Sequence, residues 1–315
     1  MFYYGGALSV SLFLFLSGYL AIKRTNLNKT DFYELLEISF NISIKRLKAI
    51  YPLHIFTLLL SIPFCYKSLF LFFSLKQWLK LFLNVFLINS FFPSCSIFNY
   101  VSWYLPVFIF ISFMSPFLTS YFKRIKNKTD FELPLLIFTT IWFIQFVWTW
   151  FWKDYTIGHW IIYACPFVRL LDFILGINVF LFEEYKNRKL LYEGLIISLI
   201  ILYISLEIKS VFFLVTTWSL PATLIILGLT NSRLDHFASL IFCNRIIVKL
   251  GDISFELFMF HQLIIRYLSF FSNKFFPIYK NSLFIYLLAF ILSVIMSLLW
   301  KRYFVNRKII GLTHI

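Results

Sequence analysis

Long apolar stretches, separated by short basic connections, are the feature of this sequence that most restricts its fold. Of its 315 residues, 61% are hydrophobic and 14% are charged, whereas a soluble domain is about 45–50% apolar and about 25% charged. Such a chain cannot hide its apolar surface in one aqueous core. A bilayer core is crossed by about 20 apolar residues in helical form, because a helix satisfies its own backbone hydrogen bonds. We therefore expect an all-α, polytopic transmembrane helical bundle.

Apolar runs of sufficient length predict about nine spans. They run from Gly5 to Ile22, Leu47 to Tyr66, Val101 to Phe122, Leu133 to Trp152, Trp160 to Phe182, Leu190 to Leu206, Val211 to Leu229, Ile253 to Phe271 and Leu283 to Trp300. The stretch from Phe70 to Phe92 differs, because it contains Lys76 and Lys80 and its apolar part is short. We interpret it as one partial helix, interfacial or re-entrant. No long linker interrupts residues 1–315, which we treat as a single domain.

The positive charges predict the orientation of these spans. Alternating nine spans across a membrane gathers most lysines and arginines on one side, and the positive-inside rule makes that side the cytoplasm. That side receives Lys23, Arg24, Lys45, Arg46, Lys48, Lys123, Arg124, Lys126, Lys128, Lys186, Arg188, Lys189, Arg233, Arg245, Lys249, Lys301, Arg302, Arg307 and Lys308, and the other receives Lys67, Lys76, Lys80, Lys153, Lys209, Lys274 and Lys280. The N-terminus is then outside and the C-terminus inside.

The same charges and the cysteines exclude two classes of site. The net charge of +15 is divided among loops that can contact anionic membrane lipids. It forms no continuous basic stripe of the kind that binds nucleic acid, so we expect no nucleic-acid partner. The cysteines, Cys65, Cys95, Cys165 and Cys243, have no metal-ligand spacing, and we expect no metal site.

Inserting a charged side chain into a membrane span costs on the order of 3 kcal/mol on insertion scales. Each such residue therefore calls for a structural or functional explanation. Arg169 and Asp172 lie three residues apart in the fifth predicted span, and therefore on one helix face. They could form a structural ion pair that fixes the rotation of the helix, or they could contact a substrate along a path through the bundle. The sequence leaves both interpretations open.

A second polar group lies at the start of the eighth predicted span. Ser254, Leu257 and His261 share one helix face, and Glu256 lies on a neighbouring face. A lone intramembrane His is often only a hydrogen-bonded structural residue, but a carboxylate and an imidazole on one helix could serve an acid–base step or a proton path. We select His261 and Glu256 as candidate catalytic residues and Ser254 as a candidate substrate contact.

Two further candidates lie at the ends of spans. Arg46 and Lys48, which with Lys45 form the basic entry to the second span, could simply set the topology. They could also bind an anion, since Arg grips phosphate with two N–H groups and Lys adds a point charge. Trp103, at the outer end of the third span, is typical of the aromatic belt at a membrane interface, and it is also a candidate along a substrate path.

Taken in order, five segments resemble the acyltransferase 3 family of membrane O-acyltransferases. They look like a glycine-rich beginning that ends in Ser-Gly-aromatic (Gly5 to Tyr19), a basic motif ending in Ile-Tyr-Pro (Arg46 to Pro52), a Trp-x-Leu element (Ser102 to Leu105), a Pro-x-x-Arg-x-x-acid-Phe-x-x-Gly helix (Pro166 to Gly176), and a Gly-x-Ile-Ser-Tyr segment ending in His-Gln (Leu250 to Gln262). The likeness covers residues 5 to 307 and rests on the order of the segments.

The resemblance implies an enzyme that uses cytoplasmic acyl-CoA, usually acetyl-CoA, to acylate a hydroxyl of an outward-facing glycan or lipid-linked sugar. It places the protein in a bacterial cell (inner) membrane and gives polysaccharide modification as its role. By the same resemblance, Arg46, with Lys48 beside it, contributes to the CoA-side basic motif, and His261 lines the central reaction path. The oligomeric state does not follow from it.

The sequence also departs from the family pattern. The family's first helix carries an Arg and the His thought to act in acyl transfer, whereas this chain begins at what resembles the second helix, so we expect an N-terminally incomplete domain. The predicted orientation agrees with this expectation, because one additional upstream helix would place the N-terminus in the cytoplasm. Ala49 stands where the basic motif usually has its second Arg, Asn306 where a Glu commonly closes the last helix, and Ser9 replaces a glycine.

Three functional hypotheses therefore remain at the level of sequence. The first is a membrane O-acyltransferase, in which an imidazole takes the hydroxyl proton while the thioester is attacked. The second is a non-enzymatic scaffold or an exporter of a sugar or lipid intermediate, whose polar path would use Arg169, Asp172 and His261. The third is a catalytically inactive remnant of such an enzyme.

Overall fold

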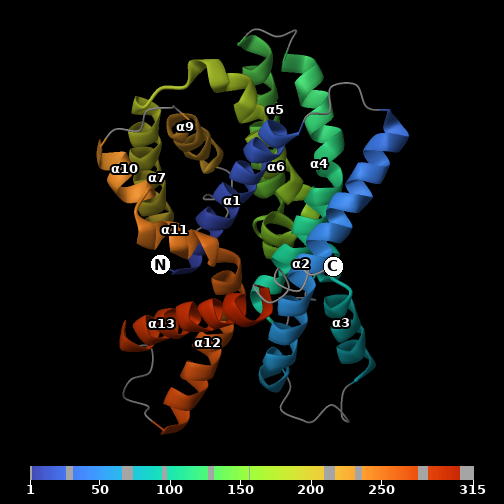
Figure 1. Ribbon diagram of the computed structural model, residues 1–315, viewed down its shortest axis with the longest axis vertical. Coiled ribbons are helices and arrows are strands. Elements are labelled where there is room, and N and C mark those ends of the chain that lie inside the picture. Colours follow the sequence, from blue (N-terminus) through green and yellow to red (C-terminus); the bar gives the residue numbers. More distant parts are fainter. Residues whose placement is uncertain are drawn as a thin grey trace, which may run out of the picture. The chain divides into compact units, whose positions relative to one another are not determined.

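Every regular element that the computed structural model describes is helical (Figure 1). The described residues are 2–25, 31–65, 74–93, 98–126, 131–155, 157–208, 217–230, 236–275 and 283–305. Within them, five helices are long and apolar enough to cross a membrane. These are α2 (Phe32–Cys65), α4 (Tyr104–Lys126) with the preceding 3₁₀ turn η3 (Tyr100–Trp103), α5 (Glu132–Trp152), α7 (Lys189–Ile208), and α13 (Leu283–Trp300) with the following π-helical turn η7 (Lys301–Val305). The all-α prediction is confirmed.

The other four predicted spans also coincide with helices. They correspond to α1 (Phe2–Arg24), α6 (Pro166–Val179), α9 (Ser219–Leu229) and α12 (Ser254–Phe275). Length and composition do not mark these as membrane spans, so the count of nine stays a prediction. The first six residues of the predicted Val211 to Leu229 span lie outside the described residues, as do Cys95, Asn306, and the loop cations Lys67, Lys128, Lys209, Arg233, Lys280, Arg307 and Lys308.

The partial helix expected between Phe70 and Phe92 is α3 (Leu75–Val85). At 11 residues it rises only about 16 Å, too little to cross a bilayer core. It buries Leu83 and Asn84, and its first turn is held by a hydrogen bond of 2.6 Å from the Ser74 N–H to Gln77 Oε1. The chain then leaves the helix through Leu87, whose φ is 56°.

The fifth predicted span is not one continuous helix. A π-helical turn, η4 (Trp160–Ala164), is followed by a break at Cys165, then by α6 and a 3₁₀ turn, η5 (Phe180–Tyr185). Cys165 has an extended backbone, with φ −66° and ψ 124°, as expected for a residue that precedes a proline. Pro166 lacks an N–H group and suits the first position of the new helix.

Contacts along the chain define two compact units. The first contains Met1–Leu47, Ser90–Ser94 and Tyr104–Asp235, and the second contains Lys48–Asn89, Cys95–Trp103 and His236–Ile315. Helix α2 contributes its first half to one unit and its second half to the other. The front half was missed by the span prediction because it carries Glu34, Glu37 and Lys45 among its apolar residues.

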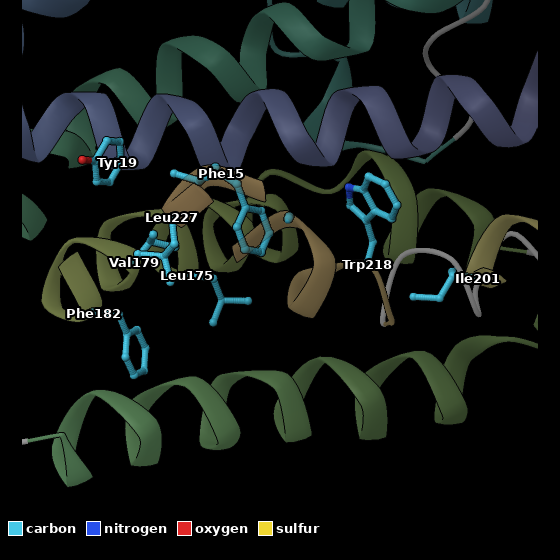
Figure 2. Close-up of a cluster of buried hydrophobic side chains, with 10 residues drawn as sticks. Phe15, Tyr19, Leu175, Val179, Phe182, Ile201, Trp218 and Leu227 are labelled. Atoms are coloured by element: carbon cyan, nitrogen blue, oxygen red, sulfur yellow. The ribbon is translucent and has the colours of Figure 1, made fainter. Parts of the chain in front are cut away.

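The core of the first unit forms where α1, α6, α7 and α9 meet (Figure 2). Phe15 from α1 is 1% exposed, Leu175 from α6 is fully buried, and Trp218, directly before α9, is buried. Helices in a lipid environment associate through such packing rather than through a hydrophobic driving force, so close contact is what stabilises this unit.

The second unit is organised around α12 and α13, which pack along each other. Phe56 of α2 contacts the rings of Phe260 and Trp300 at centroid distances of 6.2 and 5.0 Å. The Tyr267 hydroxyl donates to the Leu60 carbonyl at 2.8 Å, which ties α12 to α2. Two short helices, α10 (His236–Phe242) and α11 (Arg245–Asp252), precede α12.

Candidate functional site

Arg46 lies half-buried on α2 against one stripe of α4, within the first unit. Its Nη1 donates to Ser112 Oγ at 2.7 Å, and its guanidinium lies 4.9 Å from the centroid of the Phe108 ring. Phe108 stacks in turn on Tyr104, with centroids 6.0 Å apart. Tyr104, Phe108 and Ser112 are spaced four residues apart, so they form a single face of α4 that holds the guanidinium in place.

The hydrogen bonds around Arg46 leave most of its donors unused. Ser112 donates its own hydroxyl proton to the Phe108 carbonyl, so its oxygen accepts from Arg46. Ser112 is the one hydrogen-bond partner of Arg46, and no carboxylate pairs with it, among the residues that the structure describes. A guanidinium has five N–H donors in a planar fork that matches phosphate and carboxylate. This half-buried cation is therefore suited to an anionic ligand.

Lys48, predicted to act beside Arg46, is exposed and does not share its side of the helix. Two residues along an α-helix turn the side chain by about 200°. The structure thus does not bring Arg46 and Lys48 together on α2.

His261 lies partly buried on α12 in the second unit, with its ring turned to the backbone of its own helix. Nδ1 is 2.7 Å from the Phe258 carbonyl oxygen and 3.3 Å from that of Leu257. A carbonyl oxygen can only accept, so Nδ1 carries the proton, and Nε2 holds a lone pair. This tautomer suits a general base, because the hydrogen bond at one nitrogen fixes the orientation of the other.

Glu256 does not orient His261 in the structure. The Glu256 side chain is buried, but no hydrogen bond joins it to His261 within the described part of the chain. The positions differ by five residues, and a helix turns five residues through about 500°, which leaves the side chains diverging. Ser254 is exposed at the first turn of α12. The catalytic role of Glu256 and the substrate role of Ser254 stay predictions.

Arg169 and Asp172 form a fully buried ion pair on α6, with Nη1 2.7 Å from Oδ2. Arg169 also donates from Nε to the Tyr163 carbonyl at 2.7 Å and from Nη1 to Ser11 Oγ at 3.0 Å. Asp172 accepts a bond of 2.8 Å from Gln145 Nε2. The pair therefore joins α1, α5, η4 and α6, and each charge has several partners.

This network favours the structural interpretation of Arg169 and Asp172. A buried pair is tolerated better when hydrogen bonds satisfy its remaining lone pairs and protons, and here Ser11, Tyr163 and Gln145 supply three such bonds. Their predicted place on a substrate path is not tested by this geometry and stays a prediction.

Trp103 and His54 take buried positions in the second unit. Trp103 ends η3 and is 7% exposed, so it is packed rather than presented to a membrane surface. His54 is fully buried on α2, with Nε2 2.8 Å from the Asn84 carbonyl oxygen of α3. That bond attaches the short helix α3 to α2.

A cluster of charges at the C-terminal end of α1 ties three segments of the first unit together. Glu183 of η5 forms ion pairs with Lys23 of α1 and with Lys126 of α4, the second at 3.9 Å, and accepts from the Tyr19 hydroxyl at 3.2 Å. Partial burial alone would raise the pKa of Glu183. The hydrogen bond and charge of Lys23, with Tyr19 and Lys126, outweigh it and hold that pKa below its ordinary value of 4.5.

Sequence reasoning missed the neutral polar residues that build these arrangements. Ser112 and Gln145 contact the charged candidates, and Asn99 anchors the chain before η3 by donating from Nδ2 to the Met259 carbonyl at 3.0 Å. Each stands alone in an apolar run, and that isolation was the available signal. A polar side chain in such a run is buried at a cost unless it meets a partner.

Comparison with models of protein families gives a match over most of the chain. The family model described as an acyltransferase domain, that of the acyltransferase 3 family, matches residues 1–301. No curated protein and no solved structure matches the chain.

Proposed function

This chain belongs to the acyltransferase 3 family, and from that premise we propose that it transfers an acyl group, with acetyl as the first candidate, from cytoplasmic acyl-CoA to a hydroxyl of a cell-envelope or exported glycan. The hydroxyl oxygen attacks the thioester carbonyl, an oxygen ester forms, and the carbon–sulfur bond breaks. The hydroxyl proton passes through a base to the departing CoA thiolate. A free glycan and a lipid-linked sugar supply the same hydroxyl chemistry.

Arg46 is the proposed contact for the acyl-CoA donor. The half-buried position of its guanidinium is the observation that supports this assignment. A half-buried guanidinium with one neutral partner among the described residues is electrostatically incomplete. The phosphates of CoA would complete it, because Arg binds phosphate through two parallel N–H groups. Lys48 would add at most a point charge from the other side of α2.

His261 is the proposed base. Its Nδ1 proton is directed at the Phe258 carbonyl, which leaves Nε2 to accept the hydroxyl proton of the acceptor. The carbonyl takes the orienting role that a carboxylate has in other imidazole-based sites.

The proposed orientation follows from charge and chemistry together. An integral membrane protein with its basic connections inside would meet CoA at the cytoplasmic face of a bacterial inner membrane. The acceptor glycan would approach from the outer face, with the N-terminus of this chain outside and the C-terminus inside.

The test uses inside-out membrane vesicles from cells that express the full gene product. Labelled acetyl-CoA is added outside these vesicles, and label in the glycan fraction is measured against the concentration of acetyl-CoA. Arg46→Ala is expected to raise the KM for acetyl-CoA by about tenfold or more, the scale of one lost charge-assisted hydrogen bond. Lys45→Ala is the matched control, because Lys45 is an exposed cation one residue away.

The rival functions give different results in the same vesicles. An exporter or scaffold incorporates no label but changes the amount of glycan or lipid intermediate that crosses the membrane. An inactive remnant changes neither quantity. Labelling that is equal in Arg46→Ala and wild type would remove Arg46 from the donor site.

A further inference from the structure

Helix α11 (Arg245–Asp252), the short element that precedes α12 in the second unit, has no buried residue (Figure 1). Its apolar side chains are open, since Ile246 is 69% exposed, Ile247 45% and Val248 49%. The helix is capped at its start, because the Asn244 side chain accepts a hydrogen bond of 2.8 Å from the Ile246 N–H. A contiguous exposed apolar surface marks an interaction site, and the described part of the chain does not cover this one.

The charged and apolar residues of α11 lie on different faces. Arg245 and Lys249 are four residues apart, so they are neighbours on one face, and both are exposed. Ile247 lies about 200° around the helix axis from Arg245, and therefore on the opposite face. Neither cation forms an ion pair with a carboxylate in the part of the chain that the structure describes. Cations on one side and isoleucines on the other are typical of a helix that lies in a membrane interface.

A contact within the second unit places α11 at the end of a membrane span. Lys301, which follows the last residue of α13, donates from Nζ to the Asp252 carbonyl at 2.7 Å. Helix α13 is one of the helices that are long and apolar enough to cross a membrane. With 8 residues, α11 rises only about 12 Å, which is too little to cross a bilayer core. It therefore lies at the level where the span of α13 ends, which is the membrane surface.

The same end of the second unit carries further positive charge. Phe56 of α2 contacts the rings of Phe260 of α12 and Trp300 of α13. Two turns further along α2, Phe64 contacts the ring of Tyr267, so the second half of α2 runs parallel to α12 and begins at the end where α11 lies. The cations at this end include Lys48, Lys301 and Arg302, in addition to the two of α11. Such charge marks the cytoplasmic end of a span, where the leaflet carries anionic lipid.

We propose that α11 lies in the headgroup region of the cytoplasmic leaflet, with its isoleucines toward the acyl chains and with Arg245 and Lys249 on the phosphates of anionic lipids. Charge favours lipid over a second copy of the chain as the occupant of this surface. A symmetric pair of copies would bring the cations of one α11 against those of the other, whereas anionic lipids neutralise them. Lipid binding at α11 does not depend on the proposed acyl transfer.

The test identifies what touches the apolar face of α11. Ile247 is replaced by the photoreactive residue benzoylphenylalanine in the full chain, which is reconstituted in liposomes of equimolar phosphatidylcholine and phosphatidylglycerol. After irradiation, the mass of the intact protein shows what has been attached. The expected adduct is a phospholipid, with phosphatidylglycerol over-represented relative to its share in the liposome. The same photoreactive residue in place of Lys186, an exposed position in another connection, is the control and should give no lipid adduct.

Two charge variants, each with the photoreactive residue at position 247, test the cations. Arg245→Gln with Lys249→Gln should lower the ratio of phosphatidylglycerol to phosphatidylcholine in the adduct about fivefold for each cation removed, the scale of one cation near an anionic surface. The total yield of lipid adduct should not change, since the apolar face remains, and this shows that the variant is inserted. Lys186→Gln with Lys189→Gln removes the same net charge from exposed positions elsewhere and should leave the ratio unchanged.

Each of the other outcomes would overturn the proposal. An adduct between two copies of the chain would assign the surface to self-association, and the absence of any adduct would assign it to water. A wild-type ratio in Arg245→Gln with Lys249→Gln would remove these cations from lipid binding. An equal fall in Lys186→Gln with Lys189→Gln would show an effect of net charge and no site at α11. Acyl transfer is measured separately, through label in the glycan fraction, so its failure leaves these results unchanged.

Discussion

Gly18 and Gly176 allow α1 and α6 to touch backbone to backbone. A Cβ atom on Gly18 would lie 2.2 Å from the Phe173 carbonyl oxygen, and one on Gly176 would lie 2.1 Å from the Phe15 carbonyl oxygen. Small residues at helix interfaces are what permit such close approach in membrane proteins. Gly18 is the last but one residue of one segment on which the family resemblance rests, and Gly176 ends another. The two motifs thus meet in one contact.

The first prediction concerns that contact. Gly18→Ala or Gly176→Ala should each destabilise the protein by about 1–3 kcal/mol, because the methyl group cannot be accommodated unless the helices separate. The double variant should cost less than the sum, since the first methyl group already separates the backbones. The measurement is thermal melting in detergent, read by the monodisperse fraction that remains on size-exclusion chromatography.

Gly251→Ala is the matched control for this series. Nothing lies within 4 Å of the position where its Cβ would be. Alanine has a higher helix propensity than glycine, so this variant should melt at the wild-type temperature or slightly above it. A loss of stability at Gly251 equal to that at Gly18 would mean that the close contact of α1 and α6 is not the cause.

The second prediction concerns the ion pair between Arg169 and Asp172. Asp172→Leu leaves a buried guanidinium without its carboxylate and should cost about 3–5 kcal/mol. Arg169→Met with Asp172→Leu removes both charges and should recover most of that loss, as a double-mutant cycle by thermal melting would show. If the double variant is stable yet no longer transfers acetyl groups, the pair has the substrate role that the sequence left open.

The third prediction concerns the dependence of stability on pH. The pKa of Glu183 is held below 4.5 in the folded protein, chiefly by Lys23, so its ionised form contributes stability above that pH. This contribution is lost as the pH falls through the lowered pKa. Glu183→Gln should therefore lower the melting temperature at pH 7 and flatten its decline below about pH 4.5.

Glu184→Gln is the control for the pH series, because Glu184 is the exposed neighbour of Glu183. It should leave the melting temperature at pH 7 and the slope of the acid limb close to those of wild type. A wild-type slope in Glu183→Gln would show that the ion pairs with Lys23 and Lys126 do not contribute.

The fold could be predicted from the sequence where one physical rule dominated. The need to satisfy backbone hydrogen bonds in lipid predicted an all-helical chain, and Lys76 and Lys80 marked α3 as a partial helix. The break before Pro166 was not predicted, because hydropathy is averaged over a window and does not detect the extended backbone at Cys165. The first half of α2 was not predicted for a similar reason, because its charged residues lower the average hydropathy.

The candidate site was less predictable, because it depends on which groups meet across helices. Sequence spacing placed Arg169 and Asp172 on one face, and they do form a pair. It could not show that Gln145 and Ser11 complete them, nor that the Phe258 carbonyl, rather than Glu256, orients His261. These choices are set by side-chain rotamers and by contacts between distant segments, which no local pattern encodes.

The central claim is acyl transfer with His261 as the base, and its most direct test is a stoichiometric assay on the purified full-length protein in nanodiscs. Acetyl-CoA and an envelope glycan are supplied, and free CoA thiol and alkali-labile acetyl ester are counted in the same sample. The account predicts one thiol for each ester, and a rate in His261→Ala that is lower by a factor of about 10²–10⁴, the usual contribution of a general base. Thiol release without ester, or an unchanged rate in His261→Ala, would contradict it.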